Sequence, residues 1–161
     1  RPFVVDAGAL RAFGAERPVP AHCVATPHPG EFGLLTGAAA ADVQRDRRAA
    51  AVRFMARNDG VLVLKGSGTI VCAKDRLYVN PTGNPGMATG GAGDVLAGVL
   101  GALLGQGWEP FEAAALGVWL HGRAGDLACA ELGEESLIAG DITRHLAGAI
   151  RERKAGSGGR P

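Results

Sequence analysis

The sequence predicts an α/β domain in which helices are layered on a sheet. Three observations favour this class: strand-like runs dominate the first half of the chain, helical patterns dominate the second half, and the two alternate in between. The length of 161 residues is typical of one domain with a substantial core.

Short apolar runs predict the strands. The first two run from Phe3 to Val5 and from His22 to Thr26. VLVLK at residues 61–65 is a continuous apolar run, of the kind buried on both faces of a parallel sheet. TIVCA and RLYVN, at residues 69–73 and 76–80, are separated by Lys-Asp and therefore suggest a hairpin with a tight polar turn.

Helix signals lie between and after these runs. Pro27 and Pro29 bar a helix directly after the second strand, and a short helical turn then leads from Gly30 toward Leu35. Asp42 is the expected N-cap of a helix that reaches about Asn58, with Arg47 among the arginines on its outer sides. Three later helices are expected, from about Asp94 to Leu104, from Pro110 to about Glu131, and from a cap at Asp141 to Ile150.

Composition and charge argue against several classes of binding partner and site. The net charge of +1 provides no electrostatic footprint for nucleic acid or an acidic membrane, so we expect neither. Cys23, Cys72 and Cys129 are far apart and fit neither a disulfide framework nor a Cys-rich metal site, which favours a reducing, cytoplasmic location. The longest apolar run, residues 95–104, is too short to span a bilayer.

A glycine-rich loop leads directly into one of the predicted helices. Residues 89–93 read Thr-Gly-Gly-Ala-Gly, and the helix begins near Asp94. Unpaired N–H groups at a helix N-terminus form an anion site, and glycines let a phosphate approach them closely. Asp94 itself has two interpretations, an acid that only stabilises the helix dipole or an acid with a chemical role, and both stay open from these residues.

Two further observations favour a phosphate site of an uncommon type. Ala97, Gly98 and Gly101 predict close packing of the helix against the sheet, since a helical glycine costs about 1 kcal/mol against alanine. The loop matches neither the P-loop pattern nor the dinucleotide-binding glycine pattern, so a P-loop NTPase and a dehydrogenase are both disfavoured.

Three segments, in order, resemble one enzyme family. TPHPGE at 26–31, VLKGSGT at 63–69 and TGNPGMATGGAGDVLAGV at 82–99 are similar to the catalytic domain of the ADP- or ATP-dependent NAD(P)H-hydrate dehydratases, carbon–oxygen lyases of the ribokinase-like superfamily. The likeness extends from about Val4 to Ile150. It implies the C-terminal portion of a three-layer α/β/α sandwich over residues 1–154. The small and polar composition of the last residues separately predicts a disordered tail at 155–161.

The resemblance implies that Asp94 is the catalytic base and a substrate contact. It would take the proton from the 6-hydroxyl of hydrated NADH or NADPH, NAD(P)HX, as that oxygen attacks the terminal phosphate of ADP or ATP. Phosphate would then leave and restore NAD(P)H. Such a transfer depends on positioning and charge stabilisation. The implied anion hole consists of Gly90, Gly91, Ala92 and Gly93, and Gly93 also contacts the nucleotide.

Further contacts are implied at the ends of the strands, where ligands bind in parallel sheets. Glu31 would organise Mg²⁺ through water, and His28 would contact the substrate. The alternative for His28 is a rigid-turn residue hydrogen-bonded to backbone. Contacts to the nucleotide are implied for Lys65, Gly66, Ser67, Gly68 and Thr69, with the alternative that these glycines serve only the geometry of a turn. His22, His121 and His145 have no ligand spacing, so we expect structural or surface positions.

The chain departs from the family pattern in two places. The family usually reads Asp-Ala-Asp-Ala-Leu where residues 6–10 read DAGAL, so Gly8 replaces an acid. Complete members also have a longer preceding segment that supplies strands and part of the substrate pocket. We therefore expect either a fragment or a fold that another polypeptide completes.

Two other functions stay open, a ribokinase-like small-molecule kinase and an inactive nucleotide-binding fragment. For partners, the resemblance implies a homo-oligomer, a tetramer in particular, and a fused or separate NAD(P)HX epimerase.

Overall fold

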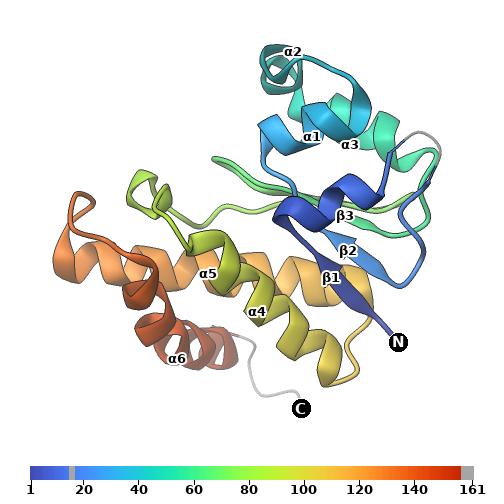
Figure 1. The fold of residues 1–161 in the computed structure, drawn as a ribbon. Helices are drawn as coiled ribbons and strands as arrows, with labels where there is room; N and C mark the ends of the chain where they lie inside the picture. The colour runs from blue at the N-terminus through green and yellow to red at the C-terminus, as the bar shows by residue number, and fades with distance from the viewer. Residues whose placement is uncertain (15–16, 157–161) are drawn as a thin grey trace.

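A five-stranded sheet forms the middle of the molecule, with helices on both of its faces (Figure 1). The computed structural model describes residues 1–14 and 17–156. The strands lie in chain order: β1 (Phe3–Val5), β2 (Cys23–Ala25), β3 (Val61–Leu64), β4 (Ile70–Cys72) and β5 (Leu77–Val79). The first three are parallel, and β4 and β5 form the predicted antiparallel hairpin. The sheet is therefore mixed, and its parallel part contains the strand ends that matter below.

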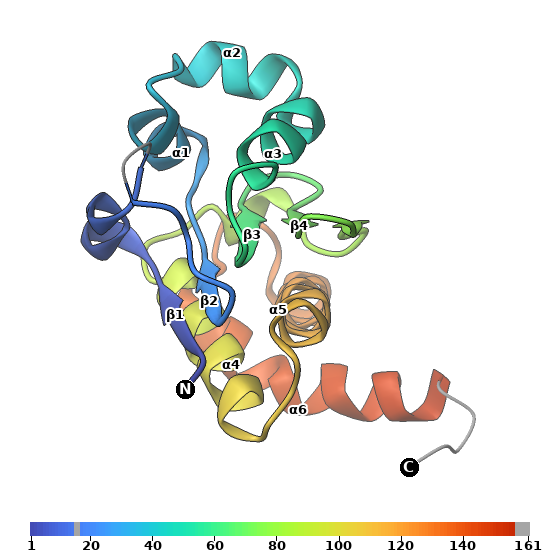
Figure 2. The same cartoon turned by 90° about the vertical axis from the view of Figure 1, so that its right-hand side faces the viewer.

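Helices cover the two faces in separate layers, which Figure 2 shows edge-on. One layer contains α1 (Pro29–Thr36), α2 (Ala40–Arg45), α3 (Arg47–Met55) and the 3₁₀ turn η1 (Ala7–Ala12). On the other face α4 (Ala92–Gly105) and α5 (Pro110–Leu132) pack on the sheet, and α6 (Ala139–Gly156) packs against α5 and α4 on their far side; a second 3₁₀ turn, η2 (Pro85–Met87), precedes α4. This arrangement confirms the predicted three-layer α/β/α class.

Strand β3 shows how the two cores are separated. Leu62 and Leu64 pack with α1 and α3, while Val61 and Val63 pack with α4 and α5. Successive side chains of a strand point to opposite faces, so all four residues are buried between two helical layers. The continuous apolar run at this position therefore has the physical cause that the sequence indicated.

The single helix predicted from Asp42 to Asn58 is wrong, because the chain breaks at Asp46. That residue adopts φ −151° and ψ 79°, and its carboxylate accepts a hydrogen bond from the N–H of Ala49 at 2.9 Å. Aspartate is favoured at an N-cap because it satisfies such a first-turn donor. Asp42 instead lies inside α2 and pairs with Arg45 at 3.1 Å.

The close packing predicted from the glycines of α4 is also wrong. A Cβ added to Gly98 or Gly101 would meet no atom within 4 Å, and both residues are exposed. The helix packs on the sheet through its leucines, which are Leu96, Leu100, Leu103 and Leu104. Glycines in close contact occur on α5 instead, as described below.

Several helix ends differ slightly from the expected positions. Helix α1 begins at Pro29, where a missing N–H costs nothing, and ends at Thr36, followed by the C-cap residue Gly37 with φ 73°. Helix α6 begins before Asp141, whose carboxylate accepts from the N–H of Ile138 at 2.9 Å. It continues through residues 155 and 156, and the rest of the predicted tail, 157–161, lies outside the described residues. No helix within the described ranges is both long and apolar enough to cross a membrane.

Replacing Asp46 with alanine is expected to lower the free energy of unfolding by about 1 kcal/mol, because the N-cap of α3 is lost. Urea unfolding measures the change. The matched control is Asp42→Ala, which removes an exposed pair and is expected to cost less than about 0.5 kcal/mol. Equal losses for the two variants would contradict a helix boundary at Asp46.

Candidate active site

The parallel strands end at one edge of the sheet, and the N-terminus of α4 lies against it. Asp6 follows β1, and Lys65 follows β3. A Cβ built on Gly93, in the first turn of α4, would lie 3.4 Å from Lys65 Nζ and 3.6 Å from Asp6 Oδ2. Because carboxyl ends of parallel strands meet at the same edge, residues 59 positions apart come into contact here.

Lys65 lies between two carboxylates. Its Nζ is 2.9 Å from Asp6 Oδ1 and 3.8 Å from Glu31 Oε2, and each of the three side chains is about one-fifth exposed. Burial alone would raise the pKa of Asp6, but hydrogen bonds from Lys65 and Thr26 and the charge of Lys65 hold it below its usual value. Asp6 is therefore ionised, and the cluster has two negative charges against one positive charge.

This cluster fits a magnesium ion held mainly through water. Mg²⁺ prefers oxygen ligands, and it commonly takes one or two carboxylates together with waters and substrate phosphates. Asp6 and Glu31 supply such oxygens beside Lys65. In the part of the chain that the structure describes, no group of three or more His, Cys, Asp or Glu side chains could hold a metal directly.

Asp6 was missed as a site residue, although the sequence placed it at the end of a strand. The pattern would have identified it once the ends of β1 and β3 were recognised as neighbours. Ala7, the next residue, has φ 49°, which is a rare conformation for a residue with a Cβ. The backbone thus turns sharply after Asp6 into η1, and strain of this kind clusters at functional sites.

His28 and Glu31 form a reciprocal cap at the start of α1. His28 Nδ1 accepts from the N–H of Gly30 at 3.0 Å and of Glu31 at 3.2 Å, and Glu31 Oε2 accepts from the N–H of His28 at 2.8 Å. The structure therefore shows His28 hydrogen-bonded to backbone, as the rigid-turn alternative expects. Its ring is 57% exposed with Nε2 3.5 Å from Glu31 Oε1, so a substrate contact at this nitrogen stays a prediction.

The glycine loop leads into α4 with unpaired donors. Gly91, the N-cap residue, has φ 87°, and α4 begins at Ala92, two residues earlier than expected. The N–H groups of Gly93 and Asp94 lie in the first turn, where no intrahelical acceptor exists, and none is found elsewhere among the described residues. Asp94 is exposed in the same turn. The arrangement can bind an anion beside a free carboxylate.

His121 of α5 binds the first turn of α4. Its Nε2 donates to the carbonyl oxygen of Ala92 at 2.9 Å. Burial lowers the pKa of His121 to about 4, so the ring is a neutral donor at neutral pH. The expectation of a structural role is consistent with this contact.

Arg47, expected on the outer side of its helix, instead binds the backbone of the Lys-Gly-Ser-Gly-Thr loop. Its Nη1 donates to the carbonyl of Lys65 at 3.2 Å, and its Nη2 donates to the carbonyls of Ser67 and, at 3.0 Å, Gly68. A Cβ on Gly66 would overlap Arg47 Nη1. No carboxylate in the described ranges pairs with this guanidinium, and burial lowers its pKa.

These hydrogen bonds orient the peptide groups of the loop. In a trans peptide the C=O and N–H point in opposite directions. With three carbonyls directed at Arg47, the N–H groups of Gly66, Gly68 and Thr69 point away from it. The loop glycines do serve geometry, with φ 136° at Gly66 and 61° at Gly68, and a nucleotide contact of this loop stays a prediction.

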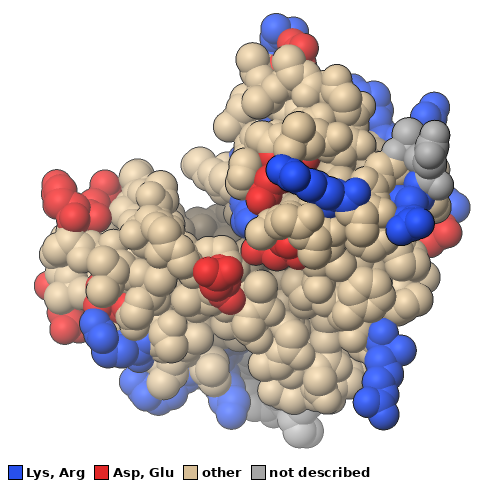
Figure 3. Space-filling view, in the orientation of Figure 1, with Lys and Arg blue, Asp and Glu red and all other residues tan. Residues whose placement is uncertain are grey.

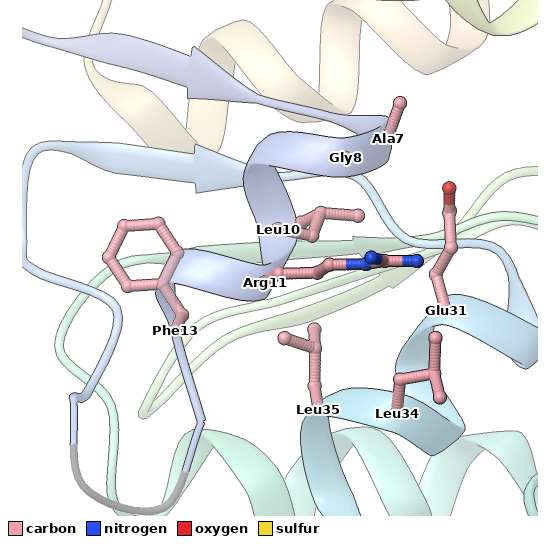
Figure 4. Close-up of a pocket in the computed structure, with 8 residues that line it drawn as sticks. All are labelled: Ala7, Gly8, Leu10, Arg11, Phe13, Glu31, Leu34 and Leu35. Atoms are coloured by element: carbon pink, nitrogen blue, oxygen red, sulfur yellow. The ribbon is translucent and has the colours of Figure 1, made fainter.

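A pocket of about 240 Å³ lies beside the cluster, between η1 and α1. Figure 4 shows Arg11 extending along it toward Glu31. A Cβ on Gly8 would meet nothing within 4 Å, so the position that departs from the family pattern opens onto this space. Figure 3 shows acidic and basic side chains close together near the middle of this face. The lining residues are Ala7, Gly8, Leu10, Arg11, Phe13, Glu31, Leu34 and Leu35.

The structure brings together only some of the predicted site residues. Lys65, Glu31 and Gly93 meet at one cluster with Asp6. Ser67 and Asp94 are exposed, and no hydrogen bond joins either side chain to that cluster.

Comparison with known proteins identifies relatives over most of the chain. A model of the NAD(P)H-hydrate dehydratase family matches residues 1–147. The chain is 46% identical over 155 residues to the bifunctional NAD(P)H-hydrate repair enzyme Nnr of Moorella thermoacetica, covering 93% of this chain and 29% of the relative. It is 43% identical over 150 residues to the ADP-dependent (S)-NAD(P)H-hydrate dehydratase of Neisseria meningitidis, covering 88% of this chain and 51% of the relative.

Solved structures agree with this likeness. The ADP/ATP-dependent NAD(P)H-hydrate dehydratase of Bacillus subtilis, co-crystallised with ATP/Mg²⁺, superposes with a TM-score of 0.84 at 34% identity, over 94% of this chain and 55% of that one. A ribokinase-like superfamily protein of Enterococcus faecalis gives 0.77 at 28% identity, over 94% and 53%. This chain thus spans about half of these structures and less than a third of the bifunctional relative.

Replacing Arg47 with methionine is expected to destabilise the fold by about 2 kcal/mol, because three carbonyls lose a charged donor. It should also speed hydrogen exchange at the amides of Gly66 to Thr69. Chemical denaturation and amide exchange measure the two effects. Arg48→Met, at the exposed neighbouring position, is the control and is expected to change neither. Unchanged exchange at 66–69 in Arg47→Met would show that this contact does not order the loop.

Proposed function

Because this chain belongs to the NAD(P)H-hydrate dehydratase family, we propose that it dehydrates hydrated NADH or NADPH to NAD(P)H with a nucleotide as phosphoryl donor. The chain spans about half of the length of the Neisseria dehydratase. The activity named for that whole relative is therefore a proposal for this chain. One observation carries the proposal. The unpaired N–H groups at the start of α4 lie beside the cluster of Lys65, Asp6 and Glu31.

Asp94 is the proposed base and substrate contact. Its carboxylate is exposed and has no hydrogen bond or ion pair in the described residues, which leaves it available for the proton of the 6-hydroxyl. Loss of that proton lets the oxygen attack the terminal phosphorus of the donor, the bond from that phosphorus to the bridging oxygen breaks, and the nucleotide leaves one phosphate shorter. The C6–O bond then breaks with phosphate as leaving group while C5 loses a proton to solvent, and the new C5–C6 double bond restores the dihydronicotinamide ring.

The remaining residues hold charge in place. Of the predicted anion hole, the N–H groups of Gly90, Gly91 and Gly93 would hydrogen-bond the oxygens of the transferred phosphoryl group, where negative charge develops, while the N–H of Ala92 already donates to Thr89 O at 3.3 Å. Lys65 would place a point charge on the donor phosphates, and the amides of Gly66, Gly68 and Thr69 would hold the rest of the nucleotide. Mg²⁺ would supply charge neutralisation on those phosphates, with Asp6 and Glu31 binding its waters.

The small-molecule kinase alternative has no support beyond fold. Hydroxyethylthiazole kinase of Pyrococcus horikoshii is 16% identical to this chain, and phosphofructokinase-2 of Escherichia coli is 20% identical, so these likenesses concern the fold alone. Both named relatives above 40% identity are NAD(P)H-hydrate repair enzymes or dehydratases.

Finer points of the proposal rest on the relatives. We propose ADP as the more suitable donor, since the Neisseria relative is named for ADP, with ATP as the alternative. An NAD(P)HX epimerase, fused or separate, is the expected partner, in line with bifunctional repair enzymes among the relatives. A homo-oligomer and a cytoplasmic location also stay predictions.

Asp94→Asn is expected to lower turnover by about 10² to 10⁴-fold, because the amide keeps the shape of the carboxylate but cannot take a proton. ADP affinity should stay within about twofold of the original protein. The assay follows recovery of dihydronicotinamide absorbance from hydrated NADH with Mg²⁺ and ADP, and calorimetry gives the affinity. Asp75→Asn, in the exposed β4–β5 turn, is the matched control and should leave both unchanged. Joint loss of ADP binding and turnover in Asp94→Asn would indicate a structural role.

A further inference from the structure

The loop from residue 80 to 91, which joins β5 to the start of α4, rests along one face of α5. Its first contacts are to α5 carbonyls. Asn80 Nδ2 donates to the carbonyl of Val118 at 3.1 Å, and Thr82 Oγ1 lies 3.1 Å from the carbonyl of Trp119. Asn80 is 4% exposed. The loop that leads into the proposed anion site is therefore anchored to helix residues 37 and 38 positions further along the chain.

Two buried glycines of α5 make this approach possible. A Cβ on Gly122 would overlap Thr82 Oγ1 and lie 2.8 Å from the Thr82 carbonyl carbon. A Cβ on Gly125 would overlap Met87 Sδ and lie 2.7 Å from Met87 Cε. Each helical glycine costs about 1 kcal/mol against alanine. Here contacts with the loop offset this cost, because Thr82 and Met87 occupy the space that side chains at Gly122 and Gly125 would fill.

Asp126, next to Gly125, holds the middle of the loop with both of its oxygens. Oδ2 accepts from the N–H of Gly83 at 3.0 Å, and Oδ1 accepts from Asn84 Nδ2 at 3.0 Å. Asn84 Oδ1 is buried without a partner, so the bond to Asp126 is what fixes the orientation of that amide. Bonds to a carboxylate are roughly twice as strong as neutral ones.

Few residues separate this contact from the phosphate site. Asn84 precedes η2, whose last residue is Met87, and the N–H of Ala92 then reaches back to Thr89 O at 3.3 Å. His121, one residue before Gly122, donates to the carbonyl of Ala92. The same face of α5 thus holds the segment at both of its ends.

We propose that Asp126 is a positioning residue, which acts through the loop on the N–H groups that bind phosphate. It does so together with the close contact at Gly122. Asp126 does not touch the reacting atoms. The ligand, a phosphate group of a nucleoside diphosphate, is the one assigned under the proposed function, and the inference rests on that function for its identity.

Asp126→Asn tests the proposal by two measurements, the dissociation constant for ADP with Mg²⁺ and hydrogen exchange at residues 83–93. An amide places a donor against a donor at Gly83 or Asn84. We therefore expect about a tenfold weaker ADP affinity and faster exchange confined to this segment. The control is Arg123→Gln, one turn earlier on α5, which removes a 2.6 Å pair with Glu152 of α6. It should leave affinity and loop exchange within about twofold of the original protein.

Gly122→Ala is the second variant, because it pushes on the loop backbone from the same side without changing charge. It should weaken ADP binding in the same direction. Gly148→Ala, whose added Cβ would lie 3.0 Å from Leu127 Cδ1 away from the loop, is its control. Unchanged ADP affinity and unchanged exchange in Asp126→Asn would overturn the proposal, as would equal effects in Arg123→Gln.

These readouts are separate from the proposed activity. If the original protein binds ADP but recovers no NAD(P)H, the proposed function fails, and the affinity ratio still decides the role of Asp126. If the original protein does not bind ADP, the assigned ligand is wrong and the proposal fails with it.

Discussion

The contact between Lys65 and Asp6 is the constraint on which the site depends. It joins the ends of β1 and β3, and it occurs because three parallel strands finish at the same edge of the sheet. Glu31 adds a second carboxylate from the start of α1. The excess negative charge suits a divalent cation, while the ammonium and the first turn of α4 suit phosphate. The site can therefore hold a cation and an anionic phosphate side by side.

Groups behind the two loops determine where their N–H donors point. Arg47 draws the carbonyls of the 65–68 segment toward itself, so the amides face outward. His121 and Asp126 hold the segment before Asp94 from α5. None of these three needs to touch a ligand. In each case a side chain fixes the orientation of backbone dipoles, and under the proposed function this would avoid reorganisation when charge develops on the phosphoryl group.

The sequence predicted the layers, the strands and the position of the glycine loop before α4, because periodicity, glycine and proline act locally. It misplaced the break at Asp46, where a capping carboxylate overrides an amphipathic pattern. It assigned the packing glycines to α4, whereas those at 122 and 125 contact a loop distant in sequence. Asp6 and Arg47 escaped notice for the same reason, since their partners are 59 and 18 or more residues away. Such contacts exist only once the sheet has formed.

The most direct test of the account is a titration of the protein with ADP and Mg²⁺, followed at each backbone amide by ¹H–¹⁵N spectroscopy. Our account predicts that amides of Gly90 to Asp94 and of Gly66 to Thr69 shift together, with a common dissociation constant, because both loops contribute to one nucleotide site. Shifts confined to one loop, or located on another face of the molecule, would contradict it.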